Sequence, residues 1–442
     1  MDFLKGDIKK LYFKYLTAAF GSALITSIYS IVDMAMVGQY QGPDGTAALA
    51  VVAPVWNVIY SLGLLMGIGG SVIFSTKRGL KEKSDGSENQ YFTAAVIGSV
   101  LLAILAWICI WIFESPILTF FGADQSLLAL AHEYMKPVKM VFPLFLFNQM
   151  LAAFLRNDKS PTLAMAGVLS GGFFNMFGDY FFVFICDMGI FGAGLATAIG
   201  SVISFLVMMT HFISQKNTLR LIRTEQLFSK LKEITVTGFS TFFIDVAMGI
   251  LTVLFNRQIM KYLGTDALSI YGPIIQVSTF AQCCAYSVGQ AAQPIISTNF
   301  GAGKGKRIKQ TLHCALWTAA FFGVFWTVLS LAAPNLYIRI FMTPTETILQ
   351  MAPAIIRTYA ISFLLLPFNI FSTYYFQAIM KPKAAFIVSV ARGLVISGIL
   401  IYLLPVITSV DSIWLTMPIT ELVVAIYAFL RIKRDTRLLE DA

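Results

Sequence analysis

The sequence predicts an all-α polytopic membrane protein with twelve transmembrane helices. Of its 442 residues, 57% are hydrophobic and only 12% are charged, whereas soluble domains are about 25% charged. Apolar segments recur along the whole chain, and none shows the alternation over roughly ten residues that marks a membrane β-strand. Each segment is long enough to cross a bilayer, which takes about 20 helical residues.

The predicted spans follow one another with short connections. Several exceed the minimal length, which permits tilting or kinking. Their ranges are 12–37, 47–76, 91–113, 132–155, 162–185, 189–213, 234–262, 267–299, 311–338, 350–379, 384–406 and 412–432.

Lysine and arginine gather in alternate connections. The basic stretches are 5–14, 77–83 (with Lys81 and Lys83), 156–159, 216–232, 304–309, 381–383 and 431–437, whereas the loops from Gln39 and from Glu114 carry no basic residue. Short cytoplasmic loops are enriched in these residues. We therefore expect a multi-pass protein of the cell (inner) membrane, with both termini cytoplasmic.

The two halves of the chain resemble each other. Gly45-Thr46 matches Gly264-Thr265 at an offset of 219 residues, and Phe147-Asn148 matches Phe368-Asn369 at an offset of 221. Because each copy has six spans, both enter from the same side, and the repeat is parallel. We predict an N-terminal six-helix lobe over 1–214, a cytoplasmic inter-lobe loop over 215–233 and a C-terminal six-helix lobe over 234–442.

Polar side chains inside the predicted spans are few. Asp33 lies in the first span, Asn175 and Asp179 lie one helical turn apart in the fifth, and Thr197 lies in the sixth. A carboxylate at membrane depth is costly and usually marks a functional site. These oxygen-bearing groups could coordinate a small hard cation, or the two carboxylates could share a proton. The alternative is a polar pair that ties neighbouring helices together.

The second half lacks this acidic pair. At an offset of 221, the positions of Asn175 and Asp179 become Ile396 and Leu400. A purely structural device would be expected in both copies, so the asymmetry favours a functional role. Two further acids lie in predicted spans and have several possible roles: Asp245 could contact substrate, form a second coupling site or bond a neighbouring helix, and Glu421 has the same alternatives.

Several classes of function find no support. The sequence has no GxxxxGK[ST] nucleotide-binding loop and no metal-ligand or redox spacing among its five cysteines. It also offers no nucleophile cluster for an enzyme and no basic face for nucleic acid. We predict a protein that is not an enzyme, with no cofactor.

Four motifs resemble the multidrug and toxic compound extrusion (MATE) family, in its prokaryotic form. They are VDMAMVG around Asp33, NMFGD ending at Asp179, GLATAIG around Thr197, and PIISTNFGAGKGKR ending at Arg307. The resemblance implies two six-helix lobes that alternate in access. It also implies a cation site formed by Asp33, Asn175, Asp179 and Thr197, a metal site if the ion is Na⁺. Two departures are an apolar stretch one turn after Asp245 and no proline early in the first span.

The resulting hypothesis is a secondary active multidrug efflux antiporter. It would export organic, often cationic, compounds in exchange for Na⁺ or H⁺, and the sequence does not choose between the ions. We expect small-molecule drugs and the lipid bilayer as partners, no nucleic acid, and a monomer. The alternative is a lipid-linked oligosaccharide flippase of the same superfamily, whose basic cavity could draw only on Lys136, Arg257 and Arg357.

Overall fold

The computed structural model describes residues 2–80, 86–341 and 344–440, so Lys81 and Lys83 of the predicted basic loop lie outside it. The described residues form α-helices (α) and short π- or 3₁₀-helical turns (η), with no strand among them. The elements are α1 Ile8–Gly79, α2 Asn89–Phe120, α3 Gln125–Asn157, α4 Pro161–Asp179, η1 Tyr180–Ile185, α5 Gly189–Met209, η2 Thr210–Ile213, α6 Leu227–Tyr262, α7 Gly264–Gly301, α8 Gly305–Ala332, α9 Pro334–Phe341, α10 Glu346–Ala360, η3 Ile361–Leu364, α11 Leu366–Ala378, α12 Pro382–Val390, η4 Ala391–Val395, α13 Ile396–Ile407, η5 Val410–Leu415 and α14 Thr416–Glu440.

The helices account for the predicted number of spans. Ten helical stretches within the described ranges are long and apolar enough to cross a membrane. One of them, α1, consists of two arms on either side of Gly42, and α7 is a further helix of 38 residues with more polar side chains. Counting both arms of α1 and adding α7 gives twelve spans, so the predicted fold class is confirmed.

The connection between the first two spans differs from the prediction. We expected a loop between residues 37 and 47, but α1 runs through this region over 72 residues. A straight helix of that length would measure about 108 Å, and the chain turns at Gly42, which has φ 69° and ψ −154°. Glycine accepts a positive φ, and Pro43 directly after it suits the first position of a new helix. The turn therefore needs one residue in place of a loop.

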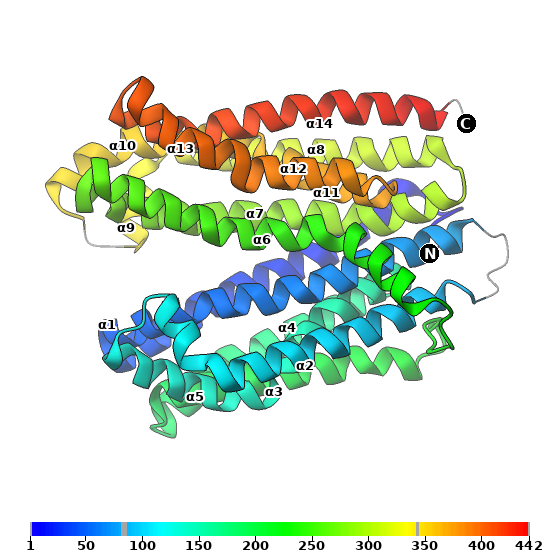
Figure 1. Cartoon of the computed structure of the whole chain (residues 1–442), viewed down its shortest axis with the longest axis horizontal. Helices are drawn as coiled ribbons and strands as arrows, with labels where there is room; N and C mark the ends of the chain where they lie inside the picture. The colour runs from blue at the N-terminus through cyan, green and yellow to red at the C-terminus, as the bar shows by residue number, and fades with distance from the viewer. Residues whose placement is uncertain (1, 81–85, 342–343, 441–442) are drawn as a thin grey trace. The chain divides into compact units, whose positions relative to one another are not determined.

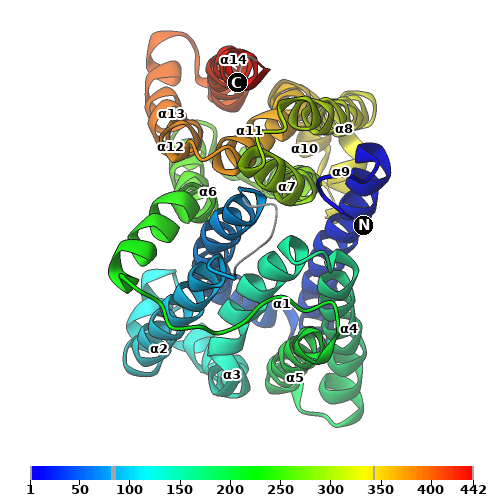
Figure 2. The same ribbon diagram turned by 90° about the vertical axis from the view of Figure 1, so that its right-hand side faces the viewer.

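The chain divides into two compact units. Unit 1 contains residues 17–242, and unit 2 contains residues 2–16 and 243–442. In Figure 1, α2 to α5 run alongside one another in unit 1, and α7, α8 and α14 do so in unit 2. The end-on view in Figure 2 places α4 beside α5 and α7 beside α11, in agreement with the contacts between these helices.

The units divide between residues 16 and 17 and between residues 242 and 243, and neither division coincides with a boundary of the predicted lobes. The predicted second lobe begins at residue 234, but the start of α6 packs against α1 in unit 1. The contact is close because glycine backbones form it: a Cβ on Gly69 would lie 2.2 Å from the Ile234 carbonyl oxygen, and one on Gly238 would lie 2.0 Å from that of Leu65. The helix α6 therefore belongs to both units.

The predicted inter-lobe loop is bonded to unit 1. The backbone N–H of Thr218 donates to Asp158 (2.9 Å), that of Arg220 to Asn89 (2.9 Å), and that of Ile222 to Thr93 (3.0 Å). These side chains satisfy backbone groups that have no strand or helix partner in this stretch. The connection is thus held along the ends of α2 and α3.

The first residues of the chain belong to unit 2. Arg307 donates to the carbonyl oxygens of Phe3 (2.9 Å) and Gly6 (2.7 Å), and Asn299 donates to that of Phe3 (3.1 Å). Phe3, Tyr12 and Tyr15 are buried in the same apolar cluster as residues of α7, α8, α11 and α14. The polar residues of the PIISTNFGAGKGKR motif therefore hold the N-terminal segment, and α1 connects this segment to unit 1.

Candidate functional site

The predicted cation-site residues come from three elements of unit 1. Asp33 lies in the first arm of α1, Asn175 and Asp179 end α4, and Thr197 lies in α5. Glycines let α4 and α5 approach closely: a Cβ on Gly178 would lie 2.9 Å from the Cβ of Ala196. Small residues at helix crossings in membranes allow such approach. The crossing places Asn175 beside Thr197.

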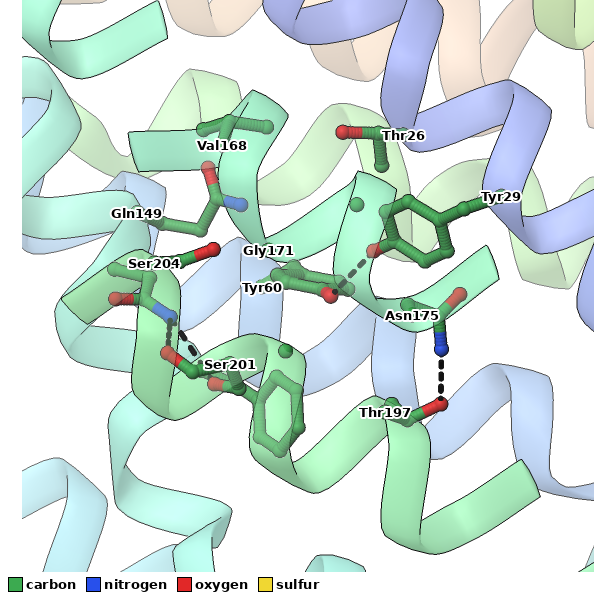
Figure 3. A pocket seen from close by; sticks show the side chains of 14 residues that line it. Thr26, Tyr29, Tyr60, Gln149, Val168, Gly171, Asn175, Thr197, Ser201 and Ser204 are labelled. Carbon is green, nitrogen blue, oxygen red and sulfur yellow. Dashed lines mark hydrogen bonds between the residues drawn. The ribbon is translucent and has the colours of Figure 1, made fainter. Parts of the chain in front are cut away.

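A chain of hydrogen bonds links three of the four predicted residues through a fourth helix. Asn175 Nδ2 donates to Thr197 Oγ1 (3.0 Å), as Figure 3 shows. Tyr134 Oη, from α3, lies 3.2 Å from Thr197 Oγ1 and donates to Asp33 Oδ2 at 3.2 Å. Because each hydroxyl has one proton, one consistent direction runs from Asn175 through Thr197 and Tyr134 to Asp33.

Asp179 lies near this chain but outside its hydrogen bonds. Its carboxylate is close enough to Asp33 and to Tyr134 for electrostatic interaction with both. Asp179 has no exposed surface, and Asn175 is 3% exposed. The structure therefore brings Asp33, Asn175, Asp179 and Thr197 into one buried region of unit 1.

The free atoms of this cluster are all acceptors. Among the described residues, Asp33 Oδ1, Asn175 Oδ1 and both Asp179 oxygens are buried without a hydrogen-bond partner. Buried polar groups are normally paired, so orphaned ones need an explanation. Four oxygens without a donor suit a bound cation or shared protons, since carboxylate and amide oxygens are ligands of hard cations.

A polar pocket adjoins the cluster. Asn175 and Thr197 line it at one end, and Asn148, Gln149 and Ser204 line it elsewhere (Figure 3). Gly171, Gly172 and Gly200 also face it, so its wall is partly backbone. The two residues shared by pocket and cluster mean that a molecule in the pocket would touch the hydrogen-bond chain.

The aromatic side of the pocket comes from both arms of α1. Tyr29 Oη lies 3.2 Å from Tyr60 Oη, with one tyrosine before and one after the turn at Gly42. Phe145 and Val168 supply apolar surface in the same pocket. The pocket thus combines neutral hydrogen-bonding groups with aromatic surface, and aromatic faces attract positive charge.

Sequence reasoning missed Tyr134. It is one of 17 tyrosines, and it lies near the start of the fourth predicted span, where a tyrosine commonly sits at a membrane interface. Its role depends on α3 packing against α5, which a single sequence does not reveal. Asn148 was noted only as a repeat residue, yet it donates to Ser201 (3.0 Å to the carbonyl oxygen) in the pocket wall.

Asp245 and Glu421 belong to unit 2, whereas the four predicted cation-site residues belong to unit 1. Asp245 accepts a hydrogen bond from Tyr286 Oη (2.7 Å). Glu421 is fully buried and pairs with Arg392, whose Nε lies 2.7 Å from Oε1. Both acids thus have hydrogen-bonding neighbours within their own unit.

The basic residues proposed for a flippase cavity are exposed. Lys136 pairs with Glu133 one turn before it, and Arg357 donates to the Leu331 carbonyl oxygen (3.1 Å). Arg257 is exposed as well. Exposed cations near helix ends are usual in membrane proteins, so the structure does not favour the flippase alternative.

Comparison with known proteins agrees with the repeat. The family model MatE matches twice, at residues 18–181 and 240–403, which start 222 residues apart. The multidrug export protein MepA of Staphylococcus aureus (strain MSSA476) is 24% identical over 411 residues, covering 92% of this chain and 89% of MepA. MepA of Staphylococcus saprophyticus is also 24% identical, with 92% and 90% covered.

Solved structures share the fold. A structure described as the outward-facing conformation of a multidrug resistance MATE family transporter aligns with a TM-score of 0.89 and 19% identity, covering 100% of this chain and 98% of that one. A transporter of the MOP superfamily from Pyrococcus furiosus gives 0.89 and 19%, covering 99% and 98%. Because the MatE model covers well over half of the sequence, in two copies, the chain belongs to the MatE family.

Proposed function

We propose that this protein is a secondary active multidrug efflux antiporter. It exports organic, often cationic, compounds in exchange for Na⁺ or H⁺. The relatives named multidrug export proteins support this substrate class. A sequence without a nucleotide-binding loop fits an ion gradient as the energy source.

One observation carries the proposal: four buried acceptor oxygens meet in unit 1 without donors among the described residues. A monovalent cation bound between Asp33 and Asp179 would offset one of two negative charges, which are costly in a membrane. Asn175 and Thr197 would complete the site. The same oxygens could hold protons in place of Na⁺, so both ions remain within the proposal.

Coupling follows from the shared residues. Asn175 and Thr197 line the polar pocket and belong to the hydrogen-bond chain. Loading the carboxylates changes which of these groups are free to bond a molecule in the pocket. A ligand shifts a conformational equilibrium only by its difference in affinity for the two states. Ion and drug would therefore compete through this chain, and the protein would release one before it binds the other.

Orientation and assembly are part of the proposal. Basic residues in alternate loops support an orientation with both termini on the cytoplasmic side of the cell (inner) membrane, and we propose that the protein works as a monomer. Green fluorescent protein fused to the C-terminus should fluoresce, because it folds in the cytoplasm but not after export through the Sec pathway. A dark fusion with normal membrane insertion would contradict the orientation.

The decisive experiment measures efflux of a fluorescent organic cation from proteoliposomes under an imposed Na⁺ gradient or an imposed pH gradient. We expect one gradient to drive efflux in the wild type and neither to drive it in Asp179→Asn. Glu133→Gln is the matched control, since it removes a partly exposed acid of the same unit whose ion pair contributes little. Gradient-driven efflux by folded Asp179→Asn at the wild-type rate would refute the site.

A further inference from the structure

We propose that Arg392 acts as a built-in cation for the C-terminal half of the protein. Its guanidinium holds Glu421 permanently neutralised, so that unit 2 does not exchange an ion at this acid. Arg392 and Glu421 are thereby residues that set the number of exchangeable cations. The inference deepens the proposed function and rests on it for its meaning in transport.

The internal repeat identifies the counterparts of this pair. At an offset of 221 residues, Arg392 corresponds to Gly171 and Glu421 to Gly200. Asn369, which also contacts Glu421, corresponds to Asn148. In unit 1 the two glycines meet backbone to backbone: a Cβ on Gly171 would lie 2.4 Å from the Gly200 carbonyl oxygen. The same crossing thus carries a pocket wall in one unit and an ion pair in the other.

Hydrogen-bond donors reach both oxygens of the Glu421 side chain. Its Oε1 accepts from Arg392 Nε at 2.7 Å, and its Oε2 accepts from Asn369 Nδ2 at 2.6 Å. Asn369 Nδ2 also donates to the Glu421 carbonyl oxygen at 2.8 Å. Arg392 is 6% exposed and Glu421 and Asn369 are fully buried. Charge-assisted hydrogen bonds of this kind are among the strongest in proteins, and an added cation would have to compete with a donor at each carboxylate oxygen.

The surroundings contain a third strong charge, on α6. Tyr359 of α10 interacts electrostatically with both members of the pair, and Tyr286 of α7 interacts with Arg392 and donates to Asp245 of α6. Arg392 therefore places a positive charge close to the buried Glu421 and to the partly buried Asp245. Removing it would leave Glu421 without its compensating charge, and a buried carboxyl in that position takes up a proton or another cation.

Residue-resolved labelling tests this directly. Dicyclohexylcarbodiimide reacts with protonated carboxyl groups in apolar surroundings, and mass spectrometry of the digested protein locates the adduct. In purified wild type at neutral pH we expect Glu421 to stay unmodified. In Arg392→Met we expect its modification to rise about tenfold or more, because burial without a counter-ion favours the neutral acid. Modification of Glu421 in wild type, or no rise in folded Arg392→Met, would overturn the inference.

A second variant covers the case in which Arg392→Met does not fold. Arg392→Met/Glu421→Gln removes both charges while keeping similar side-chain sizes. Its efflux should depend on ion concentration as in wild type, with a half-saturating concentration within about twofold, since neither residue exchanges an ion. A tenfold shift would show that the pair takes part in ion exchange and would reject the inference.

The labelling also separates this inference from the proposed function. The modification of Glu421 is read without any transport, whereas the proposed site is read from Asp179→Asn in proteoliposomes. If Asp179→Asn transports normally while Glu421 responds to Arg392 as expected, the cation site fails and the built-in cation stands. The opposite pattern leaves the site intact and removes the role of Arg392.

Discussion

Asp179 and Glu421 are both fully buried acids, one in each unit, yet their environments are opposite. Both oxygens of Glu421 are bonded, to Arg392 and Asn369. Both oxygens of Asp179 lack a partner among the described residues. Both acids are equally buried, so burial does not distinguish an acid that is available to bind an ion from one that is held in an ion pair. The number of donors that reach the carboxylate does.

Each unit also has a π-helical turn at one of these charged residues. The π-helical turn η1 begins directly after Asp179, whereas the π-helical turn η4 contains Arg392. Such turns within α-helices are rare and often mark functional positions. The repeat offset does not superpose them, because η1 corresponds to a stretch after residue 400. The π-helical turns of the two units therefore lie at different positions of the repeat, one beside Asp179 and the other at Arg392.

The strongest test of this comparison breaks the fixed pair. Arg392→Met should lower the free energy of unfolding by about 3–5 kcal/mol, since it leaves a buried charge unpaired. Arg392→Met/Glu421→Gln should lose much less, and Asp179→Asn should lose little or gain stability, because no donor is taken from Asp179. Thermal unfolding in detergent measures all three. Equal losses in Asp179→Asn and Arg392→Met would contradict the distinction.

A partnered acid in unit 1 provides the next test. Asp158 is 1% exposed and accepts from Arg78 (3.0 Å), from His211 (2.7 Å) and from the Thr218 backbone (2.9 Å). Burial alone would raise the pKa of Asp158, but the hydrogen bonds from His211 and Thr218 and the charge of Arg78 together lower it. Asp158 should thus behave as a fixed charge, like Glu421.

The sign of its pH dependence follows. A carboxyl whose pKa is depressed in the folded state stabilises the fold fully above its unfolded pKa, about 3.9, and loses that contribution as pH falls through the folded value. Asp158→Asn should cost about 2 kcal/mol at pH 7. The gap between wild type and variant should shrink below about pH 4. Thermal unfolding from pH 7 to 3, with Glu133→Gln as control, checks this; a constant gap would argue against it.

A third test adds a side chain where Gly171 of α4 packs against Gly200 of α5 in unit 1. A Cβ on Gly171 would lie 2.0 Å from Ser204 Oγ as well as close to Gly200, so Gly171→Ala should cost about 1–3 kcal/mol through overpacking. Efflux should fall with it, because the pocket wall moves. Gly249→Ala in α6 is the control, since a Cβ there meets nothing within 4 Å. Normal efflux and stability in Gly171→Ala would show that the crossing tolerates side chains, and would weaken the contrast with Arg392.

The smallest expected effect concerns the hydrogen-bond chain. Tyr134→Phe removes the hydroxyl that joins Thr197 to Asp33, at a cost of about 1 kcal/mol. We expect a several-fold change in the ion concentration that half-saturates efflux, while Tyr375→Phe, a buried tyrosine of unit 2, should leave it unchanged. If both variants kept the wild-type ion dependence, Tyr134 would be a packing residue only.

The sequence predicted the twelve spans and the repeat because apolar length and offset matches are local properties. It also selected Asp33, Asn175, Asp179 and Thr197, since polar groups at membrane depth are conspicuous against apolar neighbours; their role as an ion site stays a prediction. Tyr134 and the pairing of Arg392 with Glu421 were not foreseen. Both depend on which helix faces which, and an arginine near the end of a predicted span, such as Arg392, is commonly expected to reach the headgroup region.

The placement of the N-terminal segment was also missed. Hydropathy marks where α1 begins to be apolar, but it does not say that Phe3 packs with residues some 300 positions later. The segment contributes its own backbone carbonyl oxygens, which accept hydrogen bonds from the side chains of Asn299, Lys304 and Arg307. Such bonds leave no trace in the sequence of the segment itself, since any residue supplies a carbonyl.

This arrangement has a consequence for biosynthesis. Phe3, Tyr12 and Tyr15 leave the ribosome long before Ile432, which belongs to the cluster that buries them. At translation rates of about 5–20 residues per second, they wait roughly 20 to 85 s for their last neighbours. The N-terminal segment therefore cannot complete its packing until the C-terminal half of the chain has been made, and a fusion that hinders this segment should impair assembly of unit 2.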